Sequence, residues 1–215
     1  MTQSEHPNRL TGYFLLAMPK QGSKAPAKSP LPPPPDAPVE EETPFSGSLI
    51  YLCEHNDEGA FGIVVNRQTG LTVEQLIEGA GLLNVHVTPD NRWRGVPVYW
   101  GGPVRNDRGF ILHQPLGQWQ TTLTVSDDVG MTTSRDLLEA MASGNGPDNA
   151  LVSLGYAGWT AGQLEQELAQ NVWVPISCRD AATLLFRCAP DERVSYAIKQ
   201  LGVDPRHFTA EGGNA

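Results

Sequence analysis

Two continuous apolar runs, separated by a short polar stretch, give the clearest pattern in the chain. Residues 49–53 and 61–65 are apolar, and turn-forming residues fill 54–59. Continuous runs of this length are typical of strands buried on both faces, so the pattern predicts a β-hairpin. An apolar and aromatic run at 10–18 predicts another strand near the start of the fold.

Helix signals follow the hairpin. Thr72 and Gln75 have the spacing of a capping box, which predicts a helix at 71–77 with an apolar face formed by Val73, Leu76, Ile77 and Ala80. Thr160 and Gln163 repeat that spacing and predict a helix that carries Leu164 and Leu168. Apolar periodicity and stop signals predict three more helices, at 134–141, 180–186 and 191–201.

The remaining strands are short. Apolar or β-branched runs predict strands at 97–100, 109–114, 121–125 and 149–154, a turn at 126–130, and an extended segment at 171–175. Strands therefore come in pairs, and helices separate them at irregular intervals. This order favours an α+β domain over a regular βαβ alternation.

Composition separates one segment from the rest. Nine of the 18 prolines and three of the four lysines lie between Pro19 and Pro44, and the fourth lysine is Lys199. Such a segment buries too little apolar surface to offset its ordering entropy, so we expect an exposed, disordered insert at 20–44. Its Pro-x-x-Pro spacing leaves an adaptor role for SH3-like modules as the alternative.

Charge and length limit the partners and the location. The 215 residues carry a net charge of −9, which works against binding to nucleic acid or to anionic membranes. No apolar run approaches the roughly 18–20 residues of a membrane span, and 1–9 is polar and charged, unlike a signal peptide. Three cysteines do not indicate a disulfide framework. We therefore expect a cytoplasmic protein with no direct contact to DNA.

Cys53, Glu54 and His55 form the first candidate for chemistry. A thiol and an imidazole two residues apart in a strand share one face, where they could act as metal ligands or as a nucleophile and its base. No further Cys-x-x-Cys or His-x-His completes a zinc site. We expect no metal here and interpret Cys53 as a small buried hydrophobe.

Two glycine-rich segments form the other candidates. Gly101 and Gly102 stand among the arginines Arg92, Arg94, Arg105 and Arg108, a combination suited to an anion. Residues 155–160 are expected to form a strand-to-helix turn, which either faces a ligand or packs Tyr156 and Trp159. Neither a nucleophile elbow nor a His-Glu-x-x-His motif occurs, so no catalytic residues are predicted.

Four segments read together resemble one family. They are 12–19, 45–67, Gly101–Val104 with Arg108–His113, and Gly155–Trp159 with 162–168. In this combination the chain resembles the bacterial YqgE/AlgH family over about residues 10–208. Two features depart from the family pattern: the long insert, and Gln68 and Thr160, which stand where proline and glycine are expected.

The resemblance implies a compact α+β domain with a bifurcated β-sheet folded into a pseudo-barrel and flanked by helices. It also implies a bacterial, cytoplasmic protein with a regulatory role in transcription, and it brings no cofactor and no established catalytic residue. We expect one domain at 10–208 and flexible tails at 1–9 and 209–215.

The expected function is a regulatory or protein-interaction domain with an unknown protein partner. The alternative is a binder of a small anionic molecule, or a cryptic enzyme, with a site where nine residues converge: His55, Asn66, Arg67, Gly101, Gly102, Arg108, His113, Tyr156 and Trp159.

Overall fold

The computed structural model describes residues 10–18, 44–82 and 91–202. The predictions for the proline-rich insert at 20–44 and for both tails lie outside these residues, apart from Pro44. Within the described part, no helix has the length and hydropathy needed to cross a membrane.

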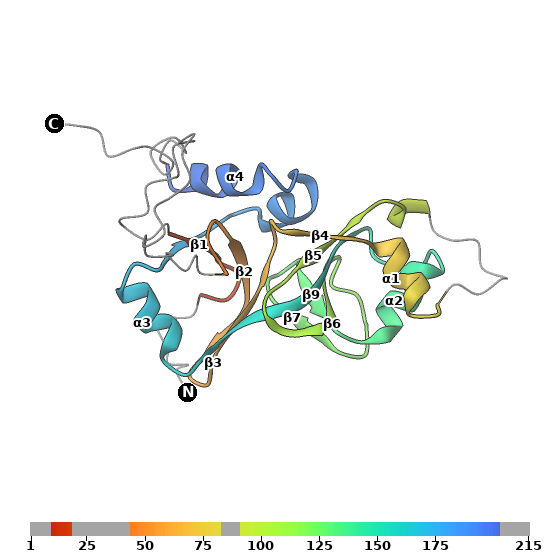
Figure 1. Ribbon diagram of the computed structural model, residues 1–215, viewed down its shortest axis with the longest axis horizontal. Helices are drawn as coiled ribbons and strands as arrows, with labels where there is room; N and C mark the ends of the chain where they lie inside the picture. Colours follow the sequence, from red (N-terminus) through yellow and green to blue (C-terminus); the bar gives the residue numbers. More distant parts are fainter. Residues whose placement is uncertain (1–9, 19–43, 83–90, 203–215) are drawn as a thin grey trace, which may run out of the picture.

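A strongly bent β-sheet runs through the molecule (Figure 1). Its strands lie in the order β10-β1-β2-β3-β9-β6-β8-β7, and β4 and β5 form a branch that joins at β9. The strands of the first half are β1 (Phe14–Ala17), β2 (Leu49–Asn56), β3 (Gly59–Val64) and β10 (Trp173–Ile176). Those of the second half are β4 (Gln68–Thr72), β5 (Pro97–Trp100), β6 (Val104–Gln114), β7 (Thr122–Thr124) and β8 (Gly130–Thr132).

The long strand β9 (Asn149–Thr160) belongs to both halves. Its last residues pair antiparallel with β3, while its first residues pair antiparallel with β6. Strand β5 adds to it in parallel at Ser153 and Leu154. Because β9 changes partners along its length, the sheet forks there, which confirms the predicted α+β class and the bifurcated sheet.

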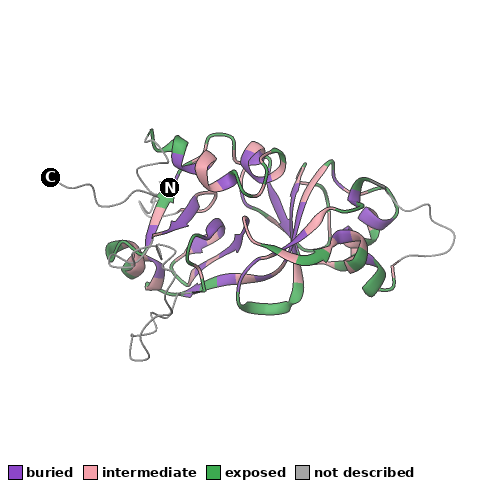
Figure 2. Ribbon diagram, turned by 45° about the horizontal axis from the view of Figure 1, so that its top comes forward, coloured by how far each residue is buried: buried purple, intermediate pink, exposed green. Residues whose placement is uncertain are grey.

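Both faces of the first half are covered. Leu49, Tyr51 and Ile63 point into a core shared with the π-helical turn η2 (Thr183–Arg187) and with α4 (Arg193–Gln200). Ile50 and Leu52, on the opposite face, pack with Leu164 of α3 (Gln163–Ala169). This double burial explains why β2 is apolar without alternation. Figure 2 shows strands that are largely buried and helices that carry buried, intermediate and exposed residues.

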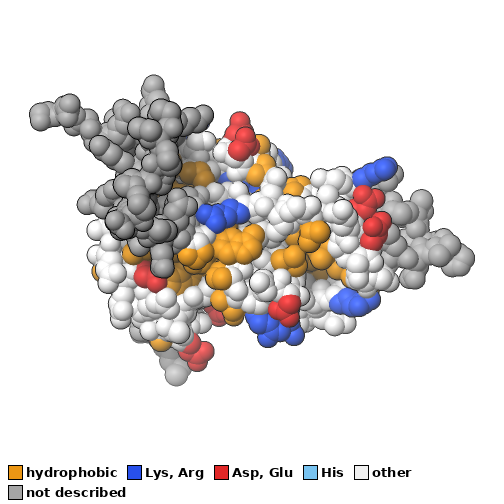
Figure 3. All heavy atoms as spheres, in the orientation of Figure 1, with side chains coloured by type: hydrophobic (Ala, Val, Ile, Leu, Met, Phe, Trp, Pro, Cys, Tyr) orange, Lys and Arg blue, Asp and Glu red, His pale blue; other side chains and the backbone are white. Residues whose placement is uncertain are grey.

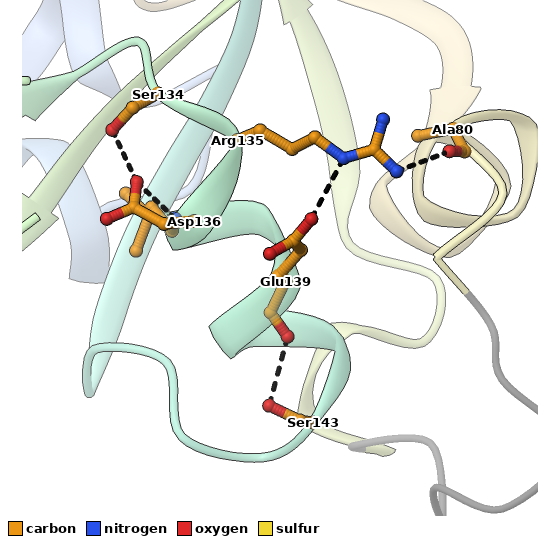
Figure 4. A network of polar contacts seen from close by, with 7 residues as sticks. Ala80, Ser134, Arg135, Asp136, Glu139 and Ser143 are labelled. Carbon is orange, nitrogen blue, oxygen red and sulfur yellow. Dashed lines mark hydrogen bonds and ion pairs between the residues drawn. The ribbon is translucent and has the colours of Figure 1, made fainter. Parts of the chain in front are cut away.

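Helices α1 (Val73–Gly79) and α2 (Arg135–Ala142) cover the second half, and a 3-10 turn, η1 (Asn91–Trp93), lies beside them. The predicted capping box of Thr72 and Gln75 is present at the start of α1. Figure 4 shows how the two helices are joined: the Arg135 guanidinium donates to Glu139 one turn later and to the carbonyl of Ala80 at the end of α1. This bond satisfies a carbonyl that the helix itself leaves without a partner.

Several predicted elements were wrong in extent. Residues 155–160 continue β9 as a strand and do not form a turn. Thr160 is therefore the last residue of a strand, and α3 is capped by Gly162 in the left-handed conformation (φ 74°). Strands β4 and β8 were missed. The helix predicted at 180–186 is present, and most of it has π-helical hydrogen bonding.

Candidate functional site

A cleft of about 570 Å³ opens between α3 and the edge strand β10. Its lining is mostly apolar; His55 and Glu165 form a polar corner, and Asn171 is the third polar residue. The lining residues are Leu10, His55, Glu165, Leu168, Asn171, Trp173, Val174 and Pro175. This volume is within the range of small-ligand and peptide pockets. The cleft is therefore the candidate binding site of the described structure.

A β-bulge aims His55 at this cleft. The β2–β3 register shifts between Leu52 and Glu54, so two residues of β2 oppose one of β3 and the in–out alternation reverses beyond that point. Cys53 consequently packs in the core beneath α4, while His55 contacts α3. The prediction that Cys53 and His55 share a face was wrong. Burial also raises the pKa of the Cys53 thiol well above its usual range, which disfavours a nucleophilic role.

The hydrogen bonds of His55 define its tautomer. The backbone N–H of Leu10 donates to Nδ1 (3.2 Å), so that nitrogen carries no proton. Nε2–H therefore donates to Glu165 Oε1 at 2.8 Å. The ring is 5% exposed, whereas the Glu165 side chain is 41% exposed. A buried, neutral imidazole thus orients a carboxylate that faces the cleft.

Glu165 is held as an anion. Its own backbone amide and the bond from His55 lower the pKa of this carboxyl, against a smaller opposing effect of burial. The carboxylate also lies in the first turn of α3, where the helix dipole favours negative charge. The polar corner of the cleft therefore carries one negative charge at neutral pH.

Glu167 fixes the aromatic wall behind the cleft. Its Oε2 accepts hydrogen bonds from the indole N–H groups of both Trp159 (2.8 Å) and Trp173 (2.6 Å). Gln163 donates to its other oxygen (2.9 Å). The two indoles meet edge to face with 5.7 Å between ring centroids. Trp159, a predicted site residue, thus supports the wall, and Trp173 lines the cleft itself.

The side chains of Asn66 and Arg67 form hydrogen bonds with backbone groups and do not line the cleft. The Asn66 side chain accepts from the amide of Leu49 and donates to the carbonyl of Gly47. The Arg67 guanidinium donates to the carbonyls of Pro44 and Ser46. Both side chains therefore hold the turn that leads into β2.

Gly101 and Gly102 are needed because β9 passes very close. A Cβ on Gly101 would lie 2.1 Å from the carbonyl oxygen of Gly155, and one on Gly102 would lie 2.2 Å from the carbonyl carbon of Tyr156. Side chains are excluded at these positions by the backbone itself. Tyr156 packs edge to face on Phe61 and tilted on Phe110. Close packing of the sheet fork explains this glycine-rich pattern.

Arg108 and His113 lie on β6, away from α3. Arg108 is exposed, and His113 is fully buried between β6 and β8. The His113 ring forms two hydrogen bonds of 2.9 Å, from Nδ1 to the carbonyl oxygen of Pro115 and between Nε2 and Thr132 Oγ1. Of the nine predicted site residues, His55 alone lines the cleft, and Trp159 lies behind it. The structure does not bring the nine together.

Sequence reasoning missed Glu165, Glu167 and Trp173, and it also missed a buried cation. Arg193 is 4% exposed and donates to the carbonyls of Val65, Leu185 and Cys188, with its guanidinium 4.9 Å from the ring centroid of Tyr99. Burial lowers the pKa of this group. Arg193 ties β3 to the C-terminal helices by satisfying carbonyls at the ends of these elements.

The polar groups at the His55–Glu165 corner of the cleft already have partners within the protein. Both nitrogens of His55 are engaged with the protein, since Nδ1 accepts from the amide of Leu10 and Nε2–H donates to Glu165. Serine, cysteine and lysine are absent from the lining described above. Among the described residues, no group of three or more His, Cys, Asp or Glu could hold a metal ion.

Comparisons with known proteins place the chain among bacterial relatives. A family model described as AlgH-like matches residues 36–206. A UPF0301 protein of Dechloromonas aromatica is 45% identical over 206 residues, covering 96% of this chain and 97% of the relative. Another, from Cupriavidus pinatubonensis, is 41% identical over the full length of both chains.

Solved structures agree with the fold. The solution structure of the AlgH protein from Pseudomonas aeruginosa superposes with a TM-score of 0.69 at 39% identity, covering 100% of both chains. A crystal structure of protein DIP2367 from Corynebacterium diphtheriae gives a TM-score of 0.53 at 18% identity, covering 81% of this chain and 78% of that one. The second likeness concerns the fold alone.

Proposed function

The chain belongs to the AlgH-like family, and from that premise we propose that it is a cytoplasmic interaction domain without catalytic activity. It binds a short hydrophobic segment of a partner protein in the cleft between α3 and β10.

The cleft itself is the observation that carries this proposal. Leu10, Leu168, Val174 and Pro175 line it with apolar surface, and its volume suits a few side chains of a peptide. Displacing water from such surface stabilises a complex in proportion to the apolar area that is covered. On the face drawn in Figure 3, hydrophobic side chains form patches with charged groups between them.

The aromatic wall is formed before any ligand arrives. Glu167 holds Trp159 and Trp173 by hydrogen bonds, and Phe45 packs edge to face on Trp173 with 5.6 Å between centroids. A wall fixed in this way loses little conformational entropy when a partner binds. The geometry therefore favours recognition by a surface that is already formed.

A role in transcription would act through such a protein partner. The net charge of −9 repels the phosphate backbone, so we expect direct affinity for DNA to be weak. An electrophoretic mobility shift assay tests this expectation. Sub-micromolar binding to duplex DNA that survives added salt would contradict it.

An anionic small molecule is the weaker candidate for this cleft. The charged group at its polar corner is the Glu165 carboxylate, which repels a phosphate or carboxylate ligand. The residues that would suit an anion, Arg67 and Arg108, lie outside the cleft lining. Anion binding by those residues stays a prediction.

Selection from a random peptide library displayed on phage tests the proposal. The full chain is immobilised, and selected clones are tested again on Pro175→Trp, which fills the mouth of the cleft from an exposed edge position. Arg108→Trp, an equally bulky change at an exposed position outside the cleft, is the control. We expect clones that bind the native chain and the control but not Pro175→Trp. Clones that bind all three proteins alike would contradict the proposal, as would a failure to enrich any clone.

A further inference from the structure

We infer that the segment bound in the α3–β10 cleft carries a basic side chain, lysine or arginine, which pairs with Glu165 while neighbouring apolar residues fill the rest of the cleft. This inference rests on the proposed function and adds the chemistry by which the partner is chosen.

The charges that line the cleft are the first support. Glu165 is the one acidic residue of the lining, and Lys and Arg are absent from it. His55 contributes no positive charge while it donates from Nε2 and accepts at Nδ1. A ligand that leaves this carboxylate without a cation would partly desolvate an unbalanced charge. A basic group removes that cost.

The position of the carboxylate is the second support. His55 holds Oε1 at 2.8 Å, and the ring that holds it is itself buried. Glu165 is therefore oriented by a hydrogen bond from a buried side chain of the fold. With 41% of its side chain exposed, the carboxylate can still be reached from the cleft. Charge-assisted hydrogen bonds are strongest when such geometry exists before binding.

The apolar lining is the third support, because it suits the stem of a basic side chain. Leu168, Val174 and Pro175 share the cleft with Glu165. Lysine and arginine characteristically lay their methylene stems along apolar surface while the charged head reaches a polar partner. One basic residue can thus use both the apolar and the acidic parts of the cleft.

The rest of the molecule favours the same partner. A net charge of −9 attracts a basic segment over distances of about a Debye length and raises its association rate. This attraction by the net charge of the whole protein is distinct from the ion pair between the basic residue and Glu165. The experiment therefore needs a control that changes the net charge equally elsewhere.

Three synthetic peptides test the inference. They have the sequence Ser-Leu-X-Leu-Ser with blocked ends, and X is Lys, Gln or Glu. Affinity is measured by NMR titration of the ¹⁵N-labelled full chain, followed at the indole N–H of Trp173. We expect the Lys peptide to bind about three- to fivefold more tightly than the Gln peptide, the size of a partly exposed ion pair. The Glu peptide should bind most weakly.

Two variants assign the effect to its residue. Glu165→Gln keeps an oxygen that can accept from His55 but removes the charge, and it should bind the Lys and Gln peptides equally. Glu139→Gln makes the same change in net charge on α2, outside the cleft, and should keep the preference for the Lys peptide.

The outcomes separate the two proposals. If all three peptides shift the Trp173 signal with equal affinity, the basic anchor is wrong and the hydrophobic binding function stands. A Lys preference that survives Glu165→Gln would also overturn the anchor. If no peptide shifts Trp173 and the phage selection yields no cleft-dependent clone, the proposed function itself fails.

Discussion

His55 and His113 are both buried, 5% and 0% exposed, yet their surroundings give them opposite tautomers. At His113, Nδ1 lies 2.9 Å from a carbonyl oxygen, which only accepts, so this nitrogen carries the proton. Nε2 then accepts from the hydroxyl of Thr132. At His55 the proton is on Nε2, because Nδ1 accepts from the amide of Leu10.

The difference lies in where each hydrogen-bond chain ends. From His113 the chain continues through Thr132 to Thr122 and stays within the second half of the sheet. From His55 it ends at a carboxylate that is 41% exposed at the edge of a cleft. The same residue type therefore supports the core in one region and orients a binding group in the other.

His113→Ala should give the largest loss of stability. It removes a fully buried ring, takes away the bond to the carbonyl of Pro115, and leaves the hydroxyl of Thr132 with Thr122 as its remaining side-chain partner. We expect a loss of about 3 kcal/mol in the free energy of unfolding, measured by urea denaturation. Binding of hydrophobic peptides in the cleft should remain unchanged at temperatures where the variant is folded. A loss below about 1 kcal/mol would mean that this network is not a structural support.

His55→Ala should separate the two regions most clearly. It removes the partners of the Leu10 amide and of Glu165, with an expected loss of about 1–2 kcal/mol in stability. The preference for a basic peptide over a neutral one should fall as well, because Glu165 loses the group that orients it. Titration of both peptides against this variant and against His113→Ala makes the comparison. If both variants preferred the basic peptide over the neutral one to the same extent, His55 would have no special role in orienting Glu165.

Mild acid should lower the free energy of unfolding through His113. Burial lowers the pKa of His113 below its ordinary value of 6.5, partly opposed by the bond to Pro115. The unfolded chain then binds a proton that the folded chain excludes, so this part of the stability is present above pH 6.5 and is lost as pH falls toward the folded pKa. Denaturation curves at several pH values should show the decline, and His113→Asn should lack it. An unchanged pH profile in that variant would contradict the assignment.

Arg108→Ala should have the smallest effect. The side chain is exposed on β6 and does not line the cleft. We expect a change within about 0.5 kcal/mol in stability and no change in peptide affinity. A marked loss of peptide binding would restore Arg108 to the site and place the binding surface on β6.

Local signals in the sequence predicted the elements that local interactions determine. The capping box of Thr72 and Gln75 predicted the start of α1, because its hydrogen bonds join residues three apart. The same spacing at Thr160 and Gln163 gave a wrong cap. There, β9 extends to Thr160 by pairing with Gly59, a contact about a hundred residues away in the chain. Strand pairing overrode the local signal.

The candidate site was harder to predict for the same reason. His55 and Glu165 meet across 110 positions of sequence, and a bulge beside Cys53 decides which face His55 takes. Strict alternation along β2 would place His55 on the same face as Cys53, away from α3. The glycines at 101, 102 and 155 were interpreted as parts of a possible anion site and of a turn, whereas the group that approaches them is the protein backbone.

Chemical-shift mapping with the Ser-Leu-Lys-Leu-Ser peptide locates the binding surface in one half of the molecule or the other, because each region contains its own tryptophan. Trp173 lines the cleft and shares Glu167 with Trp159, while the ring of Trp119 lies 6.5 Å from that of His113. We predict saturable shifts of the Trp173 and Trp159 indole signals and an unmoved Trp119 signal. Shifts at Trp119 with Trp173 unmoved would contradict binding in the α3–β10 cleft and place it in the other half of the molecule.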